Sequence, residues 1–110
     1  MTHRILLILA FLLTPALALA QSLTGAYTAQ GRNANGSAYV GTVWIEDLGA
    51  AVSVDWEVGS QAYSGTGTRE GNVLVVNWGG ASPVYYVILS NGELHGTWAN
   101  GTALEKLTPR

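Results

Sequence analysis

The chain has 110 residues, of which 48% are hydrophobic and 11% are charged; it contains no cysteine, and its formal net charge is −2. This length indicates one small domain. The lack of cysteine excludes a disulfide scaffold, a thiolate zinc site and a cysteine nucleophile. The slight negative charge argues against a protein that binds nucleic acid by neutralising phosphates.

The N-terminal segment has the layout of an export signal. A short basic start is followed by an unbroken apolar run over residues 5–13 and by a small-x-small cleavage pattern at residues 18–20. The apolar run is too short to span a bilayer. We therefore predict a signal-peptide helix at 1–20, export to the periplasm or the extracellular space, and one mature domain at 21–110 that does not span the membrane.

The rest of the chain is divided by turn signals that recur about every eleven residues, the spacing typical of a β-sandwich or barrel. Asn-Gly and Gly-Gly pairs in these turns supply the positive φ that tight hairpins need. Eight segments with strand character remain, at about 23–31, 37–47, 51–58, 61–69, 72–78, 83–89, 93–99 and 102–108. We predict an all-β domain, an eight-stranded antiparallel up-and-down barrel. A β-sandwich is the alternative.

Side-chain alternation along these segments indicates which residues face the core. Residues 51–58 alternate between apolar and polar side chains, which predicts a half-buried strand with Trp56 in the core. Trp44 is out of phase with Tyr39 on its own segment, so we expect Trp44 to be exposed or to face a partner. Trp56 thus marks the expected inner face of the domain, and Trp44 marks the expected outer face.

Two segments, 72–78 and 83–89, contain nearly continuous apolar runs instead of an alternation. Such runs belong either to central strands covered on both faces or to strands with an exposed apolar face. A weak repeat also places a glycine inside three strands, at Gly41, Gly65 and Gly96. A glycine inside a strand marks a bulge, a sharp bend or a close backbone approach, which a small closed barrel requires.

The aromatic residues are the most distinctive set, with four tryptophans and five tyrosines after residue 20. They either fill the core of a small domain or provide the contact area for a ligand or partner. The candidate ligand- or partner-binding residues are Tyr39, Trp44, Tyr85 and Trp98.

No group of residues carries the signature of an enzyme. His95 is the only histidine after residue 20, no G-x-S-x-G motif accompanies it, and we expect it on the surface of a strand. Asp55 and Glu57 lie two apart on a polar strand face, which is typical of a solvated surface. The loops lack the acidic residues of a calcium site. We therefore expect no catalytic residue, no bound metal and no cofactor.

Several short motifs together resemble a known group of proteins. They include Gly25-Ala26-Tyr27, Val54-Asp55-Trp56, Leu94-His95-Gly96-Thr97-Trp98 and the closing Glu105-Lys106-Leu107-Thr108-Pro109. This set resembles small secreted proteins of Gram-negative bacteria, some of which carry the label "fibronectin-binding protein". Related sequences often have a cysteine pair, which is absent here. The ends of the chain are also similar to avidin-type and lipocalin-type barrels, which implies ligand binding at a barrel mouth.

Together these observations predict an exported, non-enzymatic binding protein. It would present an aromatic-rich surface or barrel mouth to a host or envelope protein, as the fibronectin-binding resemblance implies. The alternatives are an inhibitor of a periplasmic hydrolase, whose loops would block an active site, and a carrier of a small apolar ligand. Nucleic acid is not an expected partner.

Overall fold

The computed structural model describes residues 21–110, and the predicted signal-peptide helix at 1–20 lies outside them. The described residues form eight strands, and the predicted segments are confirmed to within two residues at each end. The strands are β1 (Gly25–Arg32), β2 (Ala38–Asp47), β3 (Val52–Val58), β4 (Gln61–Glu70), β5 (Val73–Asn77), β6 (Val84–Ile88), β7 (Leu94–Trp98) and β8 (Ala103–Pro109). No helix in this part of the chain has the length and apolar character needed to cross a bilayer.

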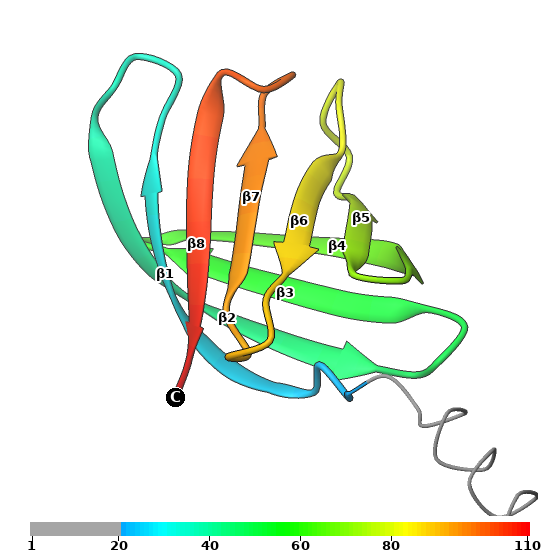
Figure 1. Cartoon of the computed structure of the whole chain (residues 1–110). Helices are drawn as coiled ribbons and strands as arrows, with labels where there is room; N and C mark the ends of the chain where they lie inside the picture. Colours follow the sequence, from blue (N-terminus) through cyan, green and yellow to red (C-terminus); the bar gives the residue numbers. More distant parts are fainter. Residues whose placement is uncertain (1–20) are drawn as a thin grey trace, which may run out of the picture.

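The strands form a closed antiparallel barrel in which each pairs with its neighbour in sequence (Figure 1). β1 also pairs with β8, from Tyr27↔Pro109 to Arg32↔Leu104, and this pairing closes the barrel. The predicted up-and-down barrel is thus confirmed and the sandwich alternative is wrong. Closure is favourable because it leaves no strand with an unpaired edge.

Alternate side chains of each strand point into the barrel and form one core. Trp56 is 7% exposed, as its phase predicts, whereas Trp44 is 45% exposed on the outer wall. The same alternation shows which of the two arrangements expected for the apolar runs at 72–78 and 83–89 is present, namely strands with an exposed apolar face. β5 and β6 bury one face, and on the other face Tyr85 and Val87 remain half exposed.

The glycines inside the strands permit close packing across the barrel wall. A Cβ atom on Gly41 would lie 2.5 Å from the backbone oxygen of Glu57, and one on Gly65 would lie 2.7 Å from that of Asn77. No side chain fits at such distances, so these positions require glycine. The close approach expected from the repeat is confirmed at both sites.

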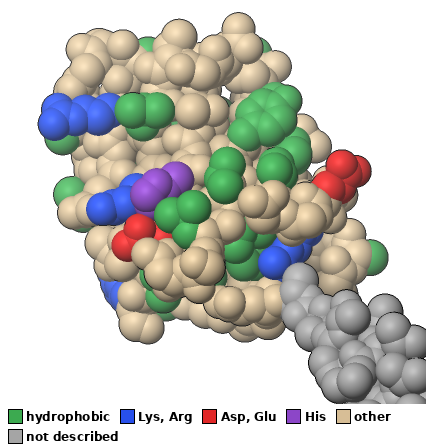
Figure 2. Space-filling model, in the orientation of Figure 1, with side chains coloured by type: hydrophobic (Ala, Val, Ile, Leu, Met, Phe, Trp, Pro, Cys, Tyr) green, Lys and Arg blue, Asp and Glu red, His purple; other side chains and the backbone are tan. Residues whose placement is uncertain are grey.

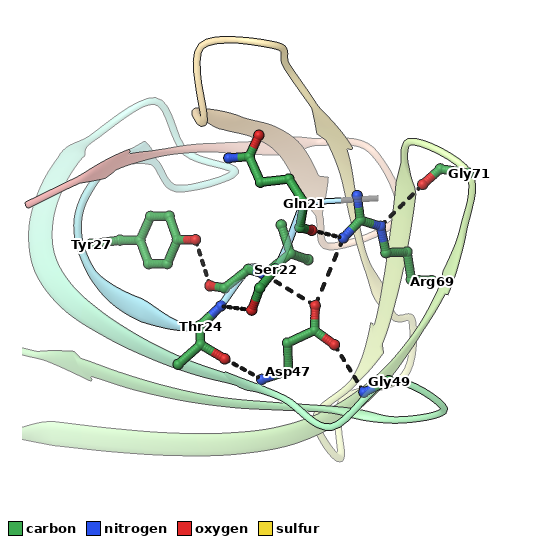
Figure 3. A network of polar contacts seen from close by, with 9 residues as sticks. Gln21, Ser22, Thr24, Tyr27, Asp47, Gly49, Arg69 and Gly71 are labelled. Carbon is green, nitrogen blue, oxygen red and sulfur yellow. Dashed lines mark hydrogen bonds and ion pairs between the residues drawn. The ribbon is translucent and has the colours of Figure 1, made fainter. Parts of the chain in front are cut away.

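One end of the barrel is covered by the residues that precede β1. Leu23 is 2% exposed, and its carbonyl accepts a 2.6 Å hydrogen bond from the Tyr27 hydroxyl. Its N–H donates to Asp47 Oδ2 at 3.1 Å, and Arg69 both lies 3.7 Å from this carboxylate oxygen and donates to the Gln21 carbonyl (Figure 3). These bonds hold the segment across the opening, because they satisfy polar groups that the barrel end would otherwise leave unpaired.

The opposite end carries the loops β1–β2, β3–β4, β5–β6 and β7–β8, three of which stand at the top of Figure 1. No segment comparable to Gln21–Thr24 covers this end in the described part of the chain. The barrel is therefore closed at one end and has a mouth at the other.

Candidate ligand-binding mouth of the barrel

The mouth contains a cavity of about 170 Å³. Its walls come from the ends of six strands and from the β1–β2 and β5–β6 loops, and they are mostly aromatic and apolar. The lining residues are Asn33, Tyr39, Trp56, Val58, Tyr63, Trp78, Val84, Trp98 and Glu105.

The four predicted binding residues fall into two groups. Tyr39 and Trp98, from β2 and β7, line the cavity together. Trp44 and Tyr85 lie on the outer wall, 45% and 50% exposed, on the separate strands β2 and β6. The structure thus brings only two of the four residues into one site.

Four aromatic rings form a continuous row around the mouth. Tyr39 packs edge-to-face on Trp98, Trp98 on Trp78, and Trp78 on Tyr63, with ring centroids 6.2, 6.2 and 5.8 Å apart. Edge-to-face packing at these distances is favourable because the positive edge of one ring meets the negative face of the next. The row is therefore held in place without a ligand.

The indole N–H groups of this row are used within the protein. Trp98 Nε1 donates to the Tyr39 hydroxyl at 3.0 Å, and Trp78 Nε1 donates to the Ser82 carbonyl at 3.0 Å. A ligand would therefore meet these two rings chiefly through their π surfaces, since an indole has no other polar hydrogen to offer.

A buried carboxylate, that of Glu105, lies at the inner side of the cavity. Glu105 is 6% exposed and is the single charged residue buried in the described part of the chain. Its Oε1 accepts a 2.9 Å bond from the Tyr39 hydroxyl, while Oε2 accepts bonds from Trp56 Nε1, at 3.0 Å, and from the Tyr86 hydroxyl. Three donors and no acceptor therefore surround the two oxygens, as an ionised carboxylate requires.

Two glycines make room for the tyrosines that bind this carboxylate. Glu105 pairs with Gly31 on one side and with Gly96 on the other. The Tyr39 ring lies over Gly31 and the Tyr86 ring over Gly96, so closely that a Cβ atom on either glycine would overlap the ring. Cross-strand pairing thus places each hydroxyl next to Glu105.

Burial and Glu105 raise the pKa values of both tyrosines. Desolvation is the largest cause for Tyr39, followed by the negative charge of Glu105, and it raises the pKa of this hydroxyl well above 10.0. Tyr86 is more deeply buried, and the same causes raise its pKa well above 10.0, opposed only by the hydrogen bond from Trp56. In the folded barrel both hydroxyls therefore remain protonated, as donors, beyond the pH at which a free tyrosine ionises.

We expect these tyrosines to make the barrel unstable to alkali. In the unfolded chain they ionise near pH 10, whereas in the folded barrel they ionise only at higher pH, so their contribution is complete below about pH 10 and is lost as the pH rises towards the folded pKa. For Tyr86 the slope is about 1.4 kcal/mol per pH unit. Urea denaturation at about pH 9 and pH 11 measures it. Tyr86→Phe is expected to reduce the loss, and Tyr85→Phe on the outer wall is the control; equal losses in both variants would contradict the assignment.

Sequence reasoning missed Glu105 as a functional candidate, although β8 carries a signal for it. Ala103, Glu105 and Leu107 are in phase, and all three are buried. A lone carboxylate on an apolar strand face is expensive to bury, which makes it a candidate for a site. Trp78 and Tyr63 were also missed, because phase alone does not show that strand ends and loops meet at one mouth.

The other polar candidates lie on the outer wall. His95 Nε2 is 2.9 Å from Glu93 Oε1, and hydrogen bonding to His95 is the largest cause that lowers the pKa of Glu93. Asp55 and Glu57 are exposed, as predicted for a solvated strand face. Among residues 21–110, no three His, Cys, Asp or Glu side chains are grouped so that they could hold a metal ion.

In residues 21–110, fold and site together define a small β-barrel that is closed at one end and carries an aromatic cavity with a buried carboxylate at the other. No family model, curated protein or solved structure matches the chain.

Proposed function

We propose that this protein is an exported, non-enzymatic binding protein that holds a small ligand at the mouth of the barrel. The observation that carries the proposal is the aromatic cavity of about 170 Å³ at the open end. Ligand sites in proteins are concave, mostly apolar, largely pre-formed and supplied with a few polar groups. The mouth has each of these properties, with Glu105 and Asn33 as the polar groups.

The size of the cavity limits the ligand. Pockets for drug-sized molecules measure roughly 300–1,000 Å³, so this cavity suits a smaller molecule or one end of a longer one. Because the edge-to-face row and the Glu105 hydrogen bonds already hold the walls, little ordering is required on binding. Pre-organisation of this kind favours affinity.

The four tryptophans provide a direct test. Trp56, Trp78 and Trp98 line the cavity, and Trp44 lies outside it, so the four indole N–H signals in a nitrogen-15 NMR spectrum divide into three reporters and an internal control. Titration with choline and with its neutral isostere 3,3-dimethylbutan-1-ol is expected to shift the three reporters and to leave Trp44 unchanged. Trp98→Ala should weaken the binding of both probes. No shift with either probe, or an equal shift at Trp44, would contradict the proposal.

A second candidate function, binding of a host or envelope protein, is favoured by the outer wall of β5 and β6. Val73 pairs with Val87 and Val75 with Tyr85, which places apolar side chains side by side. Hydrophobic side chains gather over these strands in Figure 2. Capture of the protein by immobilised fibronectin tests this candidate. Loss of capture in Tyr85→Ser but not in Trp44→Ala would support this face, whereas unchanged capture, or no capture by the unaltered protein, would reject it.

A further inference from the structure

We propose that the mouth selects a small quaternary ammonium group over a neutral group of the same shape. The inference rests on the proposed function and names the chemical class of its ligand. It combines three features of the cavity: an unbalanced negative charge, aromatic walls, and a carboxylate most of whose acceptor positions are already used.

The charge of the cavity is negative. Glu105 is the sole charged residue among those that line it. Within residues 21–110, Arg69 forms an ion pair with Asp47 and His95 lies within hydrogen-bond distance of Glu93, and neither contact includes Glu105. A buried charge without a counter-ion is costly, and a cation in the cavity would reduce that cost.

Neither Lys106, the next residue in sequence, nor Arg32, on the strand that pairs with β8, supplies this counter-ion. Lys106 follows Glu105 and therefore faces the outside of β8, where it is exposed. Arg32 lies at the end of β1, exposed, and donates to the Gly36 carbonyl in the β1–β2 loop at 3.0 Å. Neither Lys106 nor Arg32 therefore balances the charge of Glu105, and a cation bound in the cavity would do so.

The walls of the cavity suit a cation. Aromatic rings attract a cation to their faces through the negative charge of the π system, most strongly for tryptophan, and groups of such rings bind quaternary ammonium ligands. Five rings line this cavity, those of Tyr39, Trp56, Tyr63, Trp78 and Trp98. Their mutual contacts and hydrogen bonds hold them around the cavity before a ligand arrives.

The hydrogen bonds of Glu105 distinguish a quaternary from a primary ammonium. A carboxylate offers about four acceptor positions, and three are taken by Tyr39, Tyr86 and Trp56. A primary ammonium brings three N–H donors, most of which would find no acceptor among apolar walls, and unmet donors are penalised. A trimethylammonium group has no N–H donor. The negative charge of Glu105 would therefore attract it, and no donor would be left without an acceptor.

Three probes of similar length separate these contributions. Choline carries the trimethylammonium group, 3,3-dimethylbutan-1-ol has the same shape without the charge, and ethanolamine has a primary ammonium. Calorimetric titration of protein produced from the full-length coding sequence is expected to give choline an affinity about tenfold or more above each of the other two, which corresponds to about 1.4 kcal/mol. Equal affinity for choline and its neutral isostere would overturn the selectivity and leave the proposed function standing. Failure of all three probes would reject both.

Two variants, Glu105→Gln and Trp78→Leu, test whether the carboxylate and the aromatic walls produce the selectivity for choline over its neutral isostere. Glu105→Gln keeps the size of the side chain and removes its charge, so the advantage of choline over the isostere should largely disappear. Trp78→Leu removes the aromatic ring of Trp78, whose N–H donates to the Ser82 carbonyl. This variant should weaken the binding of choline more than that of the neutral isostere. Trp44→Leu, on the outer wall, is the matched control. The indole N–H signals report whether each variant is folded. Folded Glu105→Gln that keeps full selectivity would overturn the proposal, and if that variant does not fold, Trp78→Leu with unchanged selectivity would do so.

Discussion

Replacement of Glu105 by leucine is expected to lower the free energy of unfolding by about 3 kcal/mol. The substitution leaves the Tyr39 and Tyr86 hydroxyls without their shared acceptor, and it leaves the Trp56 N–H with the Tyr86 hydroxyl, 3.1 Å away, as its remaining acceptor. A buried donor without an acceptor costs about 1–3 kcal/mol. Part of the total cost is offset, because the variant no longer buries the charge of a carboxylate. Urea denaturation at neutral pH measures the change.

A double-mutant cycle separates the lost acceptor from simple repacking. If the unmet Tyr39 hydroxyl causes much of the loss, Tyr39→Phe combined with Glu105→Leu should be less destabilised than the sum of the two single variants, because both partners of one bond are then absent. The Trp98 N–H loses its acceptor in the single Tyr39→Phe variant as well, so that loss cancels in the cycle. Glu57→Leu, at an exposed position on β3, is the control for removing a carboxylate and should have little effect. A loss below about 1 kcal/mol in Glu105→Leu would contradict the role of the network.

Gly96→Ala is expected to destabilise the barrel by a similar amount, about 3 kcal/mol, at the upper end of the usual cost of overpacking. The new methyl group would overlap both the Tyr85 carbonyl oxygen and the Tyr86 ring. The backbone oxygen cannot move without breaking the pairing of β6 with β7, and the ring cannot move without leaving Glu105. The substitution therefore affects both the wall and the site.

Thermal and urea unfolding measure this effect, and for a domain of this size each kcal/mol lowers the melting temperature by about 4–8 °C. His95→Ala is the matched control, because it alters the adjacent residue of β7 on the exposed outer face. Ligand binding should also weaken in folded Gly96→Ala, since Tyr86 would no longer sit beside the carboxylate. Equal stability of Gly96→Ala and His95→Ala would show that the wall has room for a side chain.

The barrel itself was predictable because its signals are local. Asn-Gly and Gly-Gly turns, alternation around Trp56 and glycines such as Gly41 each depend on residues within one strand or one hairpin. Eight short strands in hairpin order then leave few favourable arrangements other than closure. The export signal at 1–20 remains a prediction.

The binding site was predictable only in part. Tyr39 and Trp98 were singled out as aromatic residues, and the structure places both at the mouth. Trp44 and Tyr85 were singled out on the same ground, yet they lie on the outer wall. An aromatic residue looks the same in sequence whether it lines a cavity, fills a core or faces solvent, so composition could not separate these cases.

By itself the amino-acid sequence determined the class of the domain, the number and order of its strands, and which face of a strand such as β3 is buried. These properties follow from turn chemistry and from the two-residue period of a strand, which act over a few residues. Tertiary structure alone decided that Tyr39, Tyr86 and Trp56 meet at Glu105 and that aromatic rings gather at the open end. Those contacts join residues 19 to 66 positions apart, and only the register and closure of the barrel bring them together.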